Sequence, residues 1–492
     1  MDSLLLFLIT TLCFLLYCAW LRKRPKRFPP GPLGLPLVGY APFLGENPAI
    51  TYMNMKNKYG SIFSVQIGSK NWIVLNDYKS IYEAYVTQGH AFSGRPNVVI
   101  LDVLSGHGNG MGFNDYGEMW KIQRAFLSKA LRRLSAGKGR FESAIVEESR
   151  YLNETLYVED GKATDPKIHI ARAVSNIVMN ISIGSRLPYD DERFIEIVTR
   201  LKDYFTDRID GTLFGIMFFF PMLRYLPRFR TTFAKFSKSV GRIKEVIRQF
   251  VDEHKMTFDP ENPRDVIDEF FIEAKKRPSE SKMFDDVQVI HAVNELFQAG
   301  TETSSTLILW MILVLAHHPE YQRKIEKEIS DNIGSSGTPS LKHKMSMPFT
   351  SAFIQETQRL YTITPLSMPR KTTTDVNIRG FNIPKNTPVM PNFWAVHNDP
   401  EIFEDPEKFR PERFIDSNHN FILSKHVVSF SVGPRNCMGE QLARKEVFLF
   451  LVAMLQQFRI ESDPAHPLPP LEKGVYGVAY SPYDFKVRFI QR

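Results

Sequence analysis

Outside its first twenty residues the chain contains a single cysteine, Cys437, and the loop around it restricts what the protein can be. The segment Phe430-Ser-Val-Gly433-Pro-Arg435-Asn-Cys437-Met-Gly439 fits the pattern FxxGxRxCxG at all five fixed positions. Glycines on both sides let backbone N–H groups approach the sulfur, which suits a thiolate that ligates a metal. Arg435 would reach an anionic group on a cofactor. Without such neighbours, a lone cysteine is more often a small buried apolar residue.

Four further motifs, spread along the chain, match those of one protein family. They are Trp120 with Arg124 (WxxxR), Ala299-Gly300-Thr301-Glu302-Thr303-Ser304 (an acid–alcohol pair), Glu356-Thr-Gln-Arg359 (ExxR), and Pro406, Phe409, Pro411, Arg413 and Phe414 (PxxFxPxRF). Each is weak alone, because an ExxR pair on a helix is usually an exposed ion pair. Together and in order they are strong, and by them the chain resembles the cytochrome P-450 family of haem-thiolate monooxygenases. The stretch FQAGTETSS also resembles the animal microsomal branch, which oxidises drugs, steroids and fatty acids.

The resemblance implies a mainly α-helical fold with a smaller β portion, in a single haem-binding domain behind an N-terminal transmembrane helix. A length of 492 residues favours about three domains. The motifs can serve one cofactor only if most of the chain closes around a single site, so we expect one large domain. The predicted segments are a membrane anchor at 1–21, a basic and proline-rich linker at 22–39, and a catalytic domain at 40–492.

The N-terminal segment predicts a membrane anchor. Residues 3–20 form an uncharged apolar run long enough to span a bilayer as a helix. The basic residues that follow it would keep the catalytic domain in the cytosol by the positive-inside rule, whereas a cleaved signal peptide, the alternative, carries them before the apolar run. The resemblance then implies a single-pass protein of the endoplasmic reticulum membrane. The glycosylation sequons at Asn153 and Asn180 would stay unmodified there.

The charge of the chain is concentrated beside this predicted anchor. Five of the eight net positive charges come from Arg22, Lys23, Arg24, Lys26 and Arg27, and the pI is about 9.1. Such a juxtamembrane cluster indicates attraction to anionic lipid headgroups rather than binding of nucleic acid.

The resemblance implies haem b as the cofactor, with Cys437 as the axial ligand of its iron. Phe430, Gly433 and Gly439 belong to the loop that holds this cysteine. The two propionates need cationic or N–H partners, and the candidates are Arg435, Arg124, Trp120, Arg95 and Arg370. Arg95 matches a looser family pattern, and Arg370 stands where many relatives place a histidine. For these two, an ordinary solvated arginine is the alternative.

A helix of roughly thirty residues is predicted from about Asp285 to His317, with Gly300 in its middle. A glycine there costs about 1 kcal/mol relative to alanine, so a gain in packing or function should offset it. The resemblance implies a local opening of the helix for dioxygen, with Thr303 and Glu302 managing protons. The alternatives are a threonine that bonds back to a carbonyl one turn earlier and a Glu302 in a surface ion pair.

In the family, Glu356, Arg359 and Arg413 correspond to a buried ion-pair network that supports the haem-binding loop. Removing one partner from such a network leaves an uncompensated buried charge and costs roughly 3–5 kcal/mol.

The resemblance also concerns the substrate and the electron donor. Residues 212–227 form an apolar cluster that either contacts the membrane beside the substrate entrance or is buried. An apolar pocket for a lipophilic small molecule would be lined by residues 97–113, Leu296, Phe297, Ala299, Thr303, residues 364–368 and the region near 478–480. Electrons would come from NADPH through a separate flavoprotein reductase, with cytochrome b5 as a second candidate partner, at a face that includes Lys121, Arg132, Arg133, Arg444 and Lys445.

Two other functions stay open. A haem-thiolate isomerase or dehydratase would rearrange lipid peroxides without a reductase, although such relatives often lack the acid–alcohol pair that this chain keeps. A non-catalytic haem sensor would not require Glu302 and Thr303.

Overall fold

The computed structural model describes residues 5, 7, 10–12, 24–136, 139–205 and 211–492. Most of the anchor predicted at 1–21 lies outside the described residues. The chain forms two compact units, each assembled from segments that are distant in the sequence. Unit 1 comprises the described residues up to Pro96, with Pro365–Asp399 and Ser431–Asn436; unit 2 comprises Asn97–Thr364, Pro400–Phe430 and Cys437–Arg492. The domain bounds expected from the sequence stay a prediction.

Unit 1 is built on a four-stranded sheet with the strand order β1-β2-β7-β4. The buried, β-branched residues of β1 pair antiparallel with β2, β7 runs parallel to β2, and β4 runs antiparallel to β7. Val389 pairs with Ile73 on one side and with Arg370 on the other, so that Arg370 lies at the sheet edge. The elements of unit 1 are η1 (Ala41–Phe43), α2 (Pro48–Tyr59), β1 (Ile62–Ile67), β2 (Lys70–Leu75), α3 (Tyr78–Tyr82), the π-helical turn η2 (Glu83–Thr87), β4 (Arg370–Lys371), β5 (Val376–Ile378), β6 (Phe381–Ile383), β7 (Pro388–Pro391) and α15 (Phe393–His397).

Unit 2 is mostly helical and carries two small sheets, β3-β11-β8 and β10-β9. The predicted fold class, mainly α with a smaller β portion, is confirmed. Its helices are α4 (Val99–Ser105), α5 (Glu118–Ala136), α6 (Arg140–Val158), α7 (Pro166–Ile183), α8 (Glu192–Phe205), α9 (Gly211–Phe219), η3 (Pro221–Tyr225), α10 (Pro227–Thr257), α11 (Val266–Lys276), η4 (Pro278–Met283), α12 (Asp286–His317), α13 (Pro319–Asn332), η5 (Leu341–Ser346), α14 (Pro348–Leu360), η6 (Pro411–Phe414) and α16 (Glu440–Gln457). Its strands are β3 (Ala163–Thr164), β8 (Phe458–Ser462), β9 (Val475–Tyr476), β10 (Tyr480–Ser481) and β11 (Val487–Gln491).

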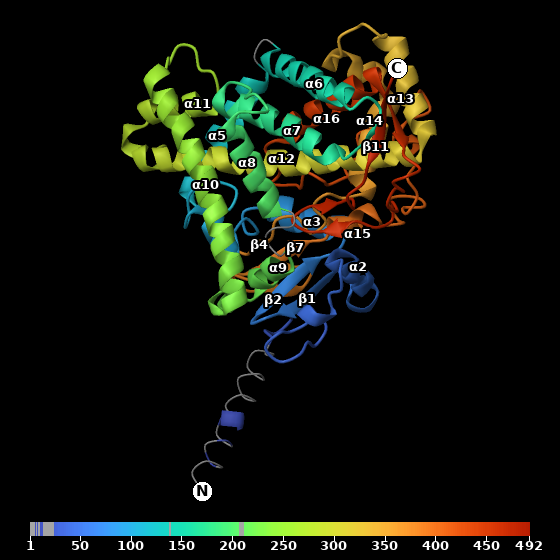
Figure 1. Ribbon diagram of the computed structural model, residues 1–492. Coiled ribbons are helices and arrows are strands. Elements are labelled where there is room, and N and C mark those ends of the chain that lie inside the picture. Colours follow the sequence, from blue (N-terminus) through green and yellow to red (C-terminus); the bar gives the residue numbers. More distant parts are fainter. Residues whose placement is uncertain (1–4, 6, 8–9, 13–23, 137–138, 206–210) are drawn as a thin grey trace. The chain divides into compact units, whose positions relative to one another are not determined.

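Helix α12 is the central element of unit 2 and contacts both α7 and α10, and Figure 1 shows α10 crossing it. Asp285 caps its first turn by accepting the N–H of Gln288 at 2.9 Å. Trp310 is fully buried, stacks on Tyr361 with ring centres 4.1 Å apart, and donates its indole N–H to the carbonyl of Tyr480 at 3.0 Å. The helix predicted from about Asp285 to His317 is therefore confirmed.

The length and apolar character of α12 reflect burial inside the protein. Within the described part of the chain it is the one helix long and apolar enough to cross a membrane, but 72% of its apolar stretch is buried. Such burial is that of a core helix, whose apolar residues pack against other helices rather than lipid.

Helix packing explains why residue 300 is a glycine, which the sequence alone did not indicate. The helix is continuous through this residue, so the local opening expected here is not seen as a break. A Cβ added to Gly300 would lie 2.8 Å from Cγ2 of Val178 on α7. Because real Cβ contacts are longer than this, the glycine lets α7 approach α12 closely.

This close approach predicts the effect of Gly300→Ala. The added methyl group should lower the free energy of unfolding by about 1–3 kcal/mol through overpacking, even though alanine is the better helix former. In a Val178→Ala background the obstructing methyl groups are absent, and most of the loss should disappear. Urea unfolding of the four proteins in a double-mutant cycle measures this; strictly additive effects would contradict it.

Candidate active site

The loop before α16 presents Cys437 to its surroundings. The Cys437 N–H donates to the carbonyl of Phe430 at 2.8 Å, which closes the loop. The backbone N–H groups of Gly439 and Glu440 donate hydrogen bonds to the sulfur, at the start of α16. The Cys437 side chain is accessible at the surface of the loop. The protein atoms that surround the sulfur partly exclude water, and this desolvation raises the pKa of the thiol. The N–H donors and the charge of Arg124 act in the opposite direction and favour the thiolate.

The two glycines of this loop differ in what they contribute: Gly439 brings its N–H to the sulfur, whereas Gly433 allows a close backbone contact. Gly439 has φ −82°, which any residue adopts, and a Cβ there would make an ordinary contact of 3.9 Å with the sulfur. Gly433 has φ +79°, and a Cβ there would lie 1.7 Å from the carbonyl oxygen of Tyr85 in unit 1. Only glycine fits at position 433 because another backbone segment passes so closely.

Helix α5 carries the WxxxR pair. Trp120 is buried, and the guanidinium of Arg124, one turn later, lies 5.8 Å from the centre of its ring. Burial lowers the pKa of Arg124, whereas the charge of Cys437 raises it. Arg124 is thus close enough to Cys437 for the two charges to interact.

The middle of α12 carries a short accessible stretch on an otherwise buried helix. Ala299 and Thr303, one turn apart, are exposed, and Gly300 and Glu302 are partly exposed. The Thr303 hydroxyl donates to the carbonyl of Ala299 at 2.7 Å. This is the backbone contact that the sequence analysis gave as the alternative for Thr303. The hydroxyl oxygen of Thr303 still has lone pairs that can accept a hydrogen bond.

Glu302 lies next to this accessible stretch. Burial raises the pKa of its carboxyl group, while Lys167 and a hydrogen bond from Thr306 act to lower it. Among the described residues it forms no ion pair, so the alternative of a surface ion pair is not what the structure shows. A carboxyl group whose pKa is raised holds its proton to a higher pH than an ordinary glutamate and can serve as a proton donor.

The structure brings Glu356, Arg359 and Arg413 together in the interior of unit 2. Arg359 donates to both carboxylate oxygens of Glu356, at 2.7 and 2.8 Å, and Arg413 donates to one of them at 3.1 Å. Glu356 and Arg359 are fully buried. Arg359 also donates to the carbonyl of Pro406, and Arg413 to the carbonyl of Glu404. The network therefore fixes the irregular segment between α15 and η6.

Three sequence-predicted arginines gather in unit 1, all of them buried. Arg370 donates to the hydroxyl of Ser431 at 2.9 Å, Arg435 to the carbonyl of Ser93 at 3.0 Å, and Arg95 to the carbonyl of Pro369 at 2.9 Å. Because all three are buried, the solvated arginine considered for Arg95 and Arg370 does not describe this structure.

Tyr85 belongs to this group, although the sequence did not indicate it. The guanidinium of Arg370 lies 3.6 Å from the centre of the Tyr85 ring. Burial raises the pKa of the phenol to about 12, against the opposing effect of Arg370 and Arg95. Nothing in the sequence around Tyr85 distinguishes it from a core tyrosine, so geometry alone reveals it.

Glu446 is a second residue that the sequence analysis missed. It lies on α16, fully inside unit 2, and accepts a hydrogen bond from Ser304 of α12 at 2.9 Å. Its other carboxyl oxygen is buried with no hydrogen-bond partner among the described residues. Burial raises the pKa of this carboxyl group to about 8, so it is mainly protonated at neutral pH. The indication available in the sequence was an acid directly before the apolar run Val447–Leu455.

Comparison with known proteins identifies the family. The family model Cytochrome P450 matches residues 29–489. The chain is 33% identical to Cytochrome P450 2U1 of Bos taurus over 99% of this chain and 93% of that protein. It is 37% identical to Cytochrome P450 2F2 of Mus musculus over 91% of each, and 31% identical to Cytochrome P450 18a1 of Drosophila melanogaster over 99% of this chain and 91% of that protein. The chain belongs to the cytochrome P450 family.

Family membership gives the enzyme class and the cofactor. The protein is a haem-dependent monooxygenase that acts on lipophilic substrates with redox partners, as the motifs predicted. The residues present fit a haem. Cys437 offers an accessible sulfur that receives two backbone N–H groups, and unit 1 supplies buried guanidinium groups of the kind that bind carboxylates.

The buried ion-pair network predicts a large effect of Glu356→Ala. The substitution leaves Arg359 buried without its carboxylate, which should lower the free energy of unfolding by roughly 3–5 kcal/mol and reduce the haem content of the purified protein. Glu404→Ala is the matched control, because Glu404 pairs with Arg410 and its side chain is 79% exposed; it should change stability by less than about 0.5 kcal/mol. Haem absorbance relative to protein absorbance, with urea unfolding, measures both variants, and equal effects would contradict the prediction.

Glu446 predicts a specific dependence of stability on pH. In the unfolded chain a glutamate ionises near pH ~4.3, whereas in the folded protein Glu446 keeps its proton up to about pH 8. Unfolding therefore releases a proton between these values, and the folded protein loses stability as the pH rises through this range, then levels off. Glu446→Gln should flatten this part of the profile, so that its stability relative to the wild type improves toward pH 8.

Ser304→Ala is the companion variant, because it removes the hydrogen bond but keeps the titrating group. It should lower stability and retain the pH dependence. Urea unfolding midpoints at several pH values measure all three proteins. Parallel profiles for the wild type and Glu446→Gln would show that Glu446 does not titrate in this range.

Proposed function

We propose that the chain binds haem b through Cys437 and inserts one oxygen atom of O2 into a steroid, a fatty acid or a xenobiotic. The observation that supports this most is the geometry of the sulfur: Cys437 is accessible, and the N–H groups of Gly439 and Glu440 point at it from the start of α16. Such donors stabilise a thiolate without neutralising it. Haem ligated in this way supplies O–O bond cleavage, favoured by the electron density of the thiolate.

The arginines are proposed to hold the propionates of the cofactor. Arg95, Arg370 and Arg435 in unit 1, and Arg124 with Trp120 in unit 2, are the groups with suitable charge or N–H donors. The burial of the three arginines in unit 1 supports this role, because a hydrogen bond between charged groups is stronger when water is excluded. Phe430, Gly433 and Gly439 are proposed to shape the loop. The stacking of the Arg444 guanidinium on the Phe430 ring, 4.8 Å from its centre, supports a fixed loop start.

Glu302 and Thr303 are proposed to deliver protons at the accessible stretch of α12. The raised pKa of Glu302 makes it a suitable proton donor. The Thr303 oxygen is anchored by its bond to the carbonyl of Ala299 and can accept a hydrogen bond from a neighbouring donor. The Glu356, Arg359 and Arg413 network is proposed to support the haem-binding loop without taking part in the reaction; its hydrogen bonds to the carbonyls of residues 404–408 support a structural role.

Electrons are proposed to come from NADPH through a separate flavoprotein reductase, with cytochrome b5 as a second donor. Of the cations proposed for that docking face, Arg133 pairs with Glu269 at 2.6 Å and Arg444 with Glu440 at 2.9 Å. Lys445 donates to the carbonyl of Ser135 at 3.2 Å. These contacts hold the cations in place, where they would still contribute to the field that steers an acidic partner.

The protein is proposed to be anchored in the endoplasmic reticulum membrane by residues 1–21, with its catalytic part in the cytosol. One structural observation supports that orientation. The side-chain amide of Asn153 donates to the carbonyl of Ala453 at 2.9 Å, a contact that suits an unmodified asparagine. Glycan attached at Asn153 or Asn180 would contradict the orientation.

Thiolate ligation predicts the spectrum of the reduced protein with carbon monoxide. Dithionite-reduced wild type should show a strongly red-shifted Soret band, and Cys437→Ser should lose it because an alcohol does not replace the thiolate. Cys18→Ser, which removes a cysteine elsewhere in the chain, should keep the band. Folded, haem-loaded wild type without this band would overturn the assignment of Cys437.

The substrate class needs a second experiment. Steroids, fatty acids and aromatic xenobiotics are added to the oxidised protein, and a shift of the haem from low to high spin identifies those that enter the site. NADPH oxidation with reductase then separates a monooxygenase from a lipid peroxide isomerase or a haem sensor, since neither consumes NADPH.

A further inference from the structure

The hydroxyl group of Tyr85 is a buried polar group to which the proposed function assigns no role. Tyr85 lies in the middle of the π-helical turn η2, and its side chain is fully buried. The hydroxyl oxygen is shielded from water and has no hydrogen-bond partner among the described residues. Because native proteins satisfy nearly all of their buried polar groups, this hydroxyl calls for an acceptor that the described part of the chain does not supply.

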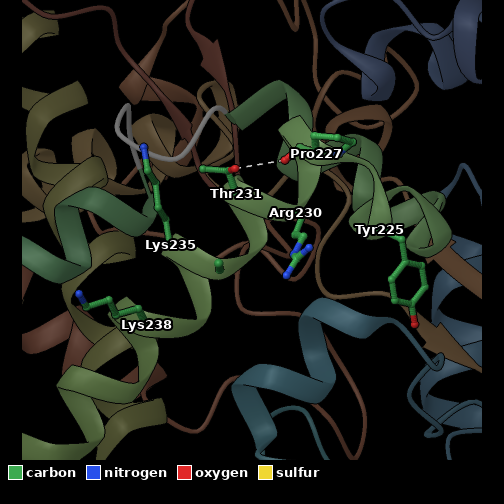
Figure 2. Close-up of a pocket in the computed structure, with 7 residues that line it drawn as sticks. Tyr225, Pro227, Arg230, Thr231, Lys235 and Lys238 are labelled. Atoms are coloured by element: carbon green, nitrogen blue, oxygen red, sulfur yellow. Dashed lines mark hydrogen bonds between the residues drawn. The ribbon is translucent and has the colours of Figure 1, made fainter.

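The hydroxyl groups in the cleft of Figure 2 provide a contrast. Tyr225 lines this cleft, is 63% exposed, and accepts a hydrogen bond from Arg224 at 2.8 Å. Thr231 lines it as well and donates to the carbonyl of Pro227 at 3.1 Å, as the dashed line in the figure shows. Water and the chain itself therefore satisfy these groups, and nothing about them requires a ligand. The hydroxyl of Tyr85 differs in both respects.

Two buried guanidinium groups lie close to the Tyr85 phenol. The guanidinium of Arg370 lies 3.6 Å from the centre of the phenol ring, and both Arg370 and Arg95 are buried. Burial raises the pKa of the phenol to about 12, and the positive charges of the two arginines act in the opposite direction. The phenol therefore keeps its proton at neutral pH and is a hydrogen-bond donor. A donor held beside two buried cations suits an acceptor that carries negative charge.

Neutral groups of unit 1 hold these guanidinium groups in place. Arg370 donates to the hydroxyl of Ser431 at 2.9 Å and to the carbonyl of Val432 at 3.2 Å. Arg95 donates to the carbonyl of Pro369 at 2.9 Å. These bonds fix the orientation of both positive charges relative to the phenol.

The backbone of Tyr85 is fixed against the start of the haem-binding loop. A Cβ added to Gly433 would lie 1.7 Å from the carbonyl oxygen of Tyr85, so the two segments are in direct backbone contact. The π-helical turn around Tyr85 is closed by the N–H of Gln88, which donates to the carbonyl of Glu83 at 2.9 Å. The phenol therefore has a fixed place within the unit that also holds residues 431–436 of the loop.

We propose that the hydroxyl of Tyr85 donates a hydrogen bond to a propionate carboxylate of the bound haem, beside Arg370 and Arg95. The inference rests on the proposed function, which places the propionates at these arginines, and it adds a neutral donor to the site. A carboxylate accepts several hydrogen bonds, so the phenol and a guanidinium group can bind the same one. Tyr85 thus helps to retain the cofactor without adding charge to its site. A buried water molecule is the other acceptor that a phenol can meet, and the test separates the two.

Tyr85→Phe isolates the hydroxyl, because the ring beside Arg370 stays. In the purified holoprotein, the resonance Raman band of propionate bending should fall in frequency, because this band responds to hydrogen bonds at the carboxylate. Transfer of haem to an excess of apomyoglobin should become on the order of tenfold faster, as expected for the loss of one hydrogen bond to a charged group. The Raman band is the decisive measurement, since a tyrosine with a purely structural role would not change it.

Tyr361→Phe is the matched control. Tyr361 is also buried, and its ring stacks on Trp310 in unit 2. Removing its hydroxyl should leave both the Raman band and the rate of haem transfer as they are in the wild type. Should Tyr85→Phe not fold, 3-fluorotyrosine incorporated into the wild type takes its place. Its more acidic phenol is a stronger donor and should raise the frequency of the propionate band.

A Tyr85→Phe protein with the Raman band of the wild type would overturn the proposal, whether or not haem leaves faster, and would assign the hydroxyl to a buried water molecule or to packing. A band that 3-fluorotyrosine does not move would overturn it too. The difference spectrum with carbon monoxide keeps this result apart from the proposed function. If haem-loaded wild type lacks the red-shifted band, ligation by Cys437 fails while the Raman comparison stays valid. A wild type that takes up no haem would overturn both.

Discussion

The buried carboxylate of Glu356 is the interaction on which much of unit 2 depends. It accepts hydrogen bonds from the guanidinium groups of Arg359 and Arg413 and from the backbone N–H of Arg410, so its charge is compensated without water. The same guanidinium groups bind backbone carbonyls of residues 404–408. An irregular loop buried away from water needs partners for its carbonyls, and these arginines provide them. Residues 404–408 are therefore held by hydrogen bonds from charged groups rather than by a strand or a helix.

Helix α12 combines two requirements that usually conflict. Its second half is a closely packed core, where Trp310 stacks on Tyr361, while its middle exposes Ala299 and Thr303 and carries the acid Glu302. Packing against α7 without a side chain at Gly300 brings the two helices together. The packed half thus fixes the position of the accessible stretch, so the groups that we propose handle protons lie on a helix rather than on a loop.

The sequence predicted those parts of the fold that depend on short patterns. The α12 helix was predicted from a long segment without proline, and the Glu356 network was implied by the resemblance to the family. Contacts between distant segments were not accessible in this way. Tertiary packing, which neither periodicity nor motif spacing encodes, brings Gly433 against the carbonyl of Tyr85. It also brings Glu446 within hydrogen-bonding distance of Ser304. The backbone N–H of Gly439 does reach the sulfur, although the conformation of this residue is one that any amino acid adopts.

The strand order of unit 1 has a consequence for synthesis of the chain. Strand β2 is complete at Leu75, but its parallel partner β7 begins only at Pro388, and the last segment of the unit ends at Asn436. Until the ribosome has made those residues, the hairpin of β1 and β2 exposes one unpaired, largely apolar edge, which is prone to pair with other chains. Unit 1 can therefore close only near the end of translation, and a chain truncated before Pro388 is left with an edge that promotes aggregation.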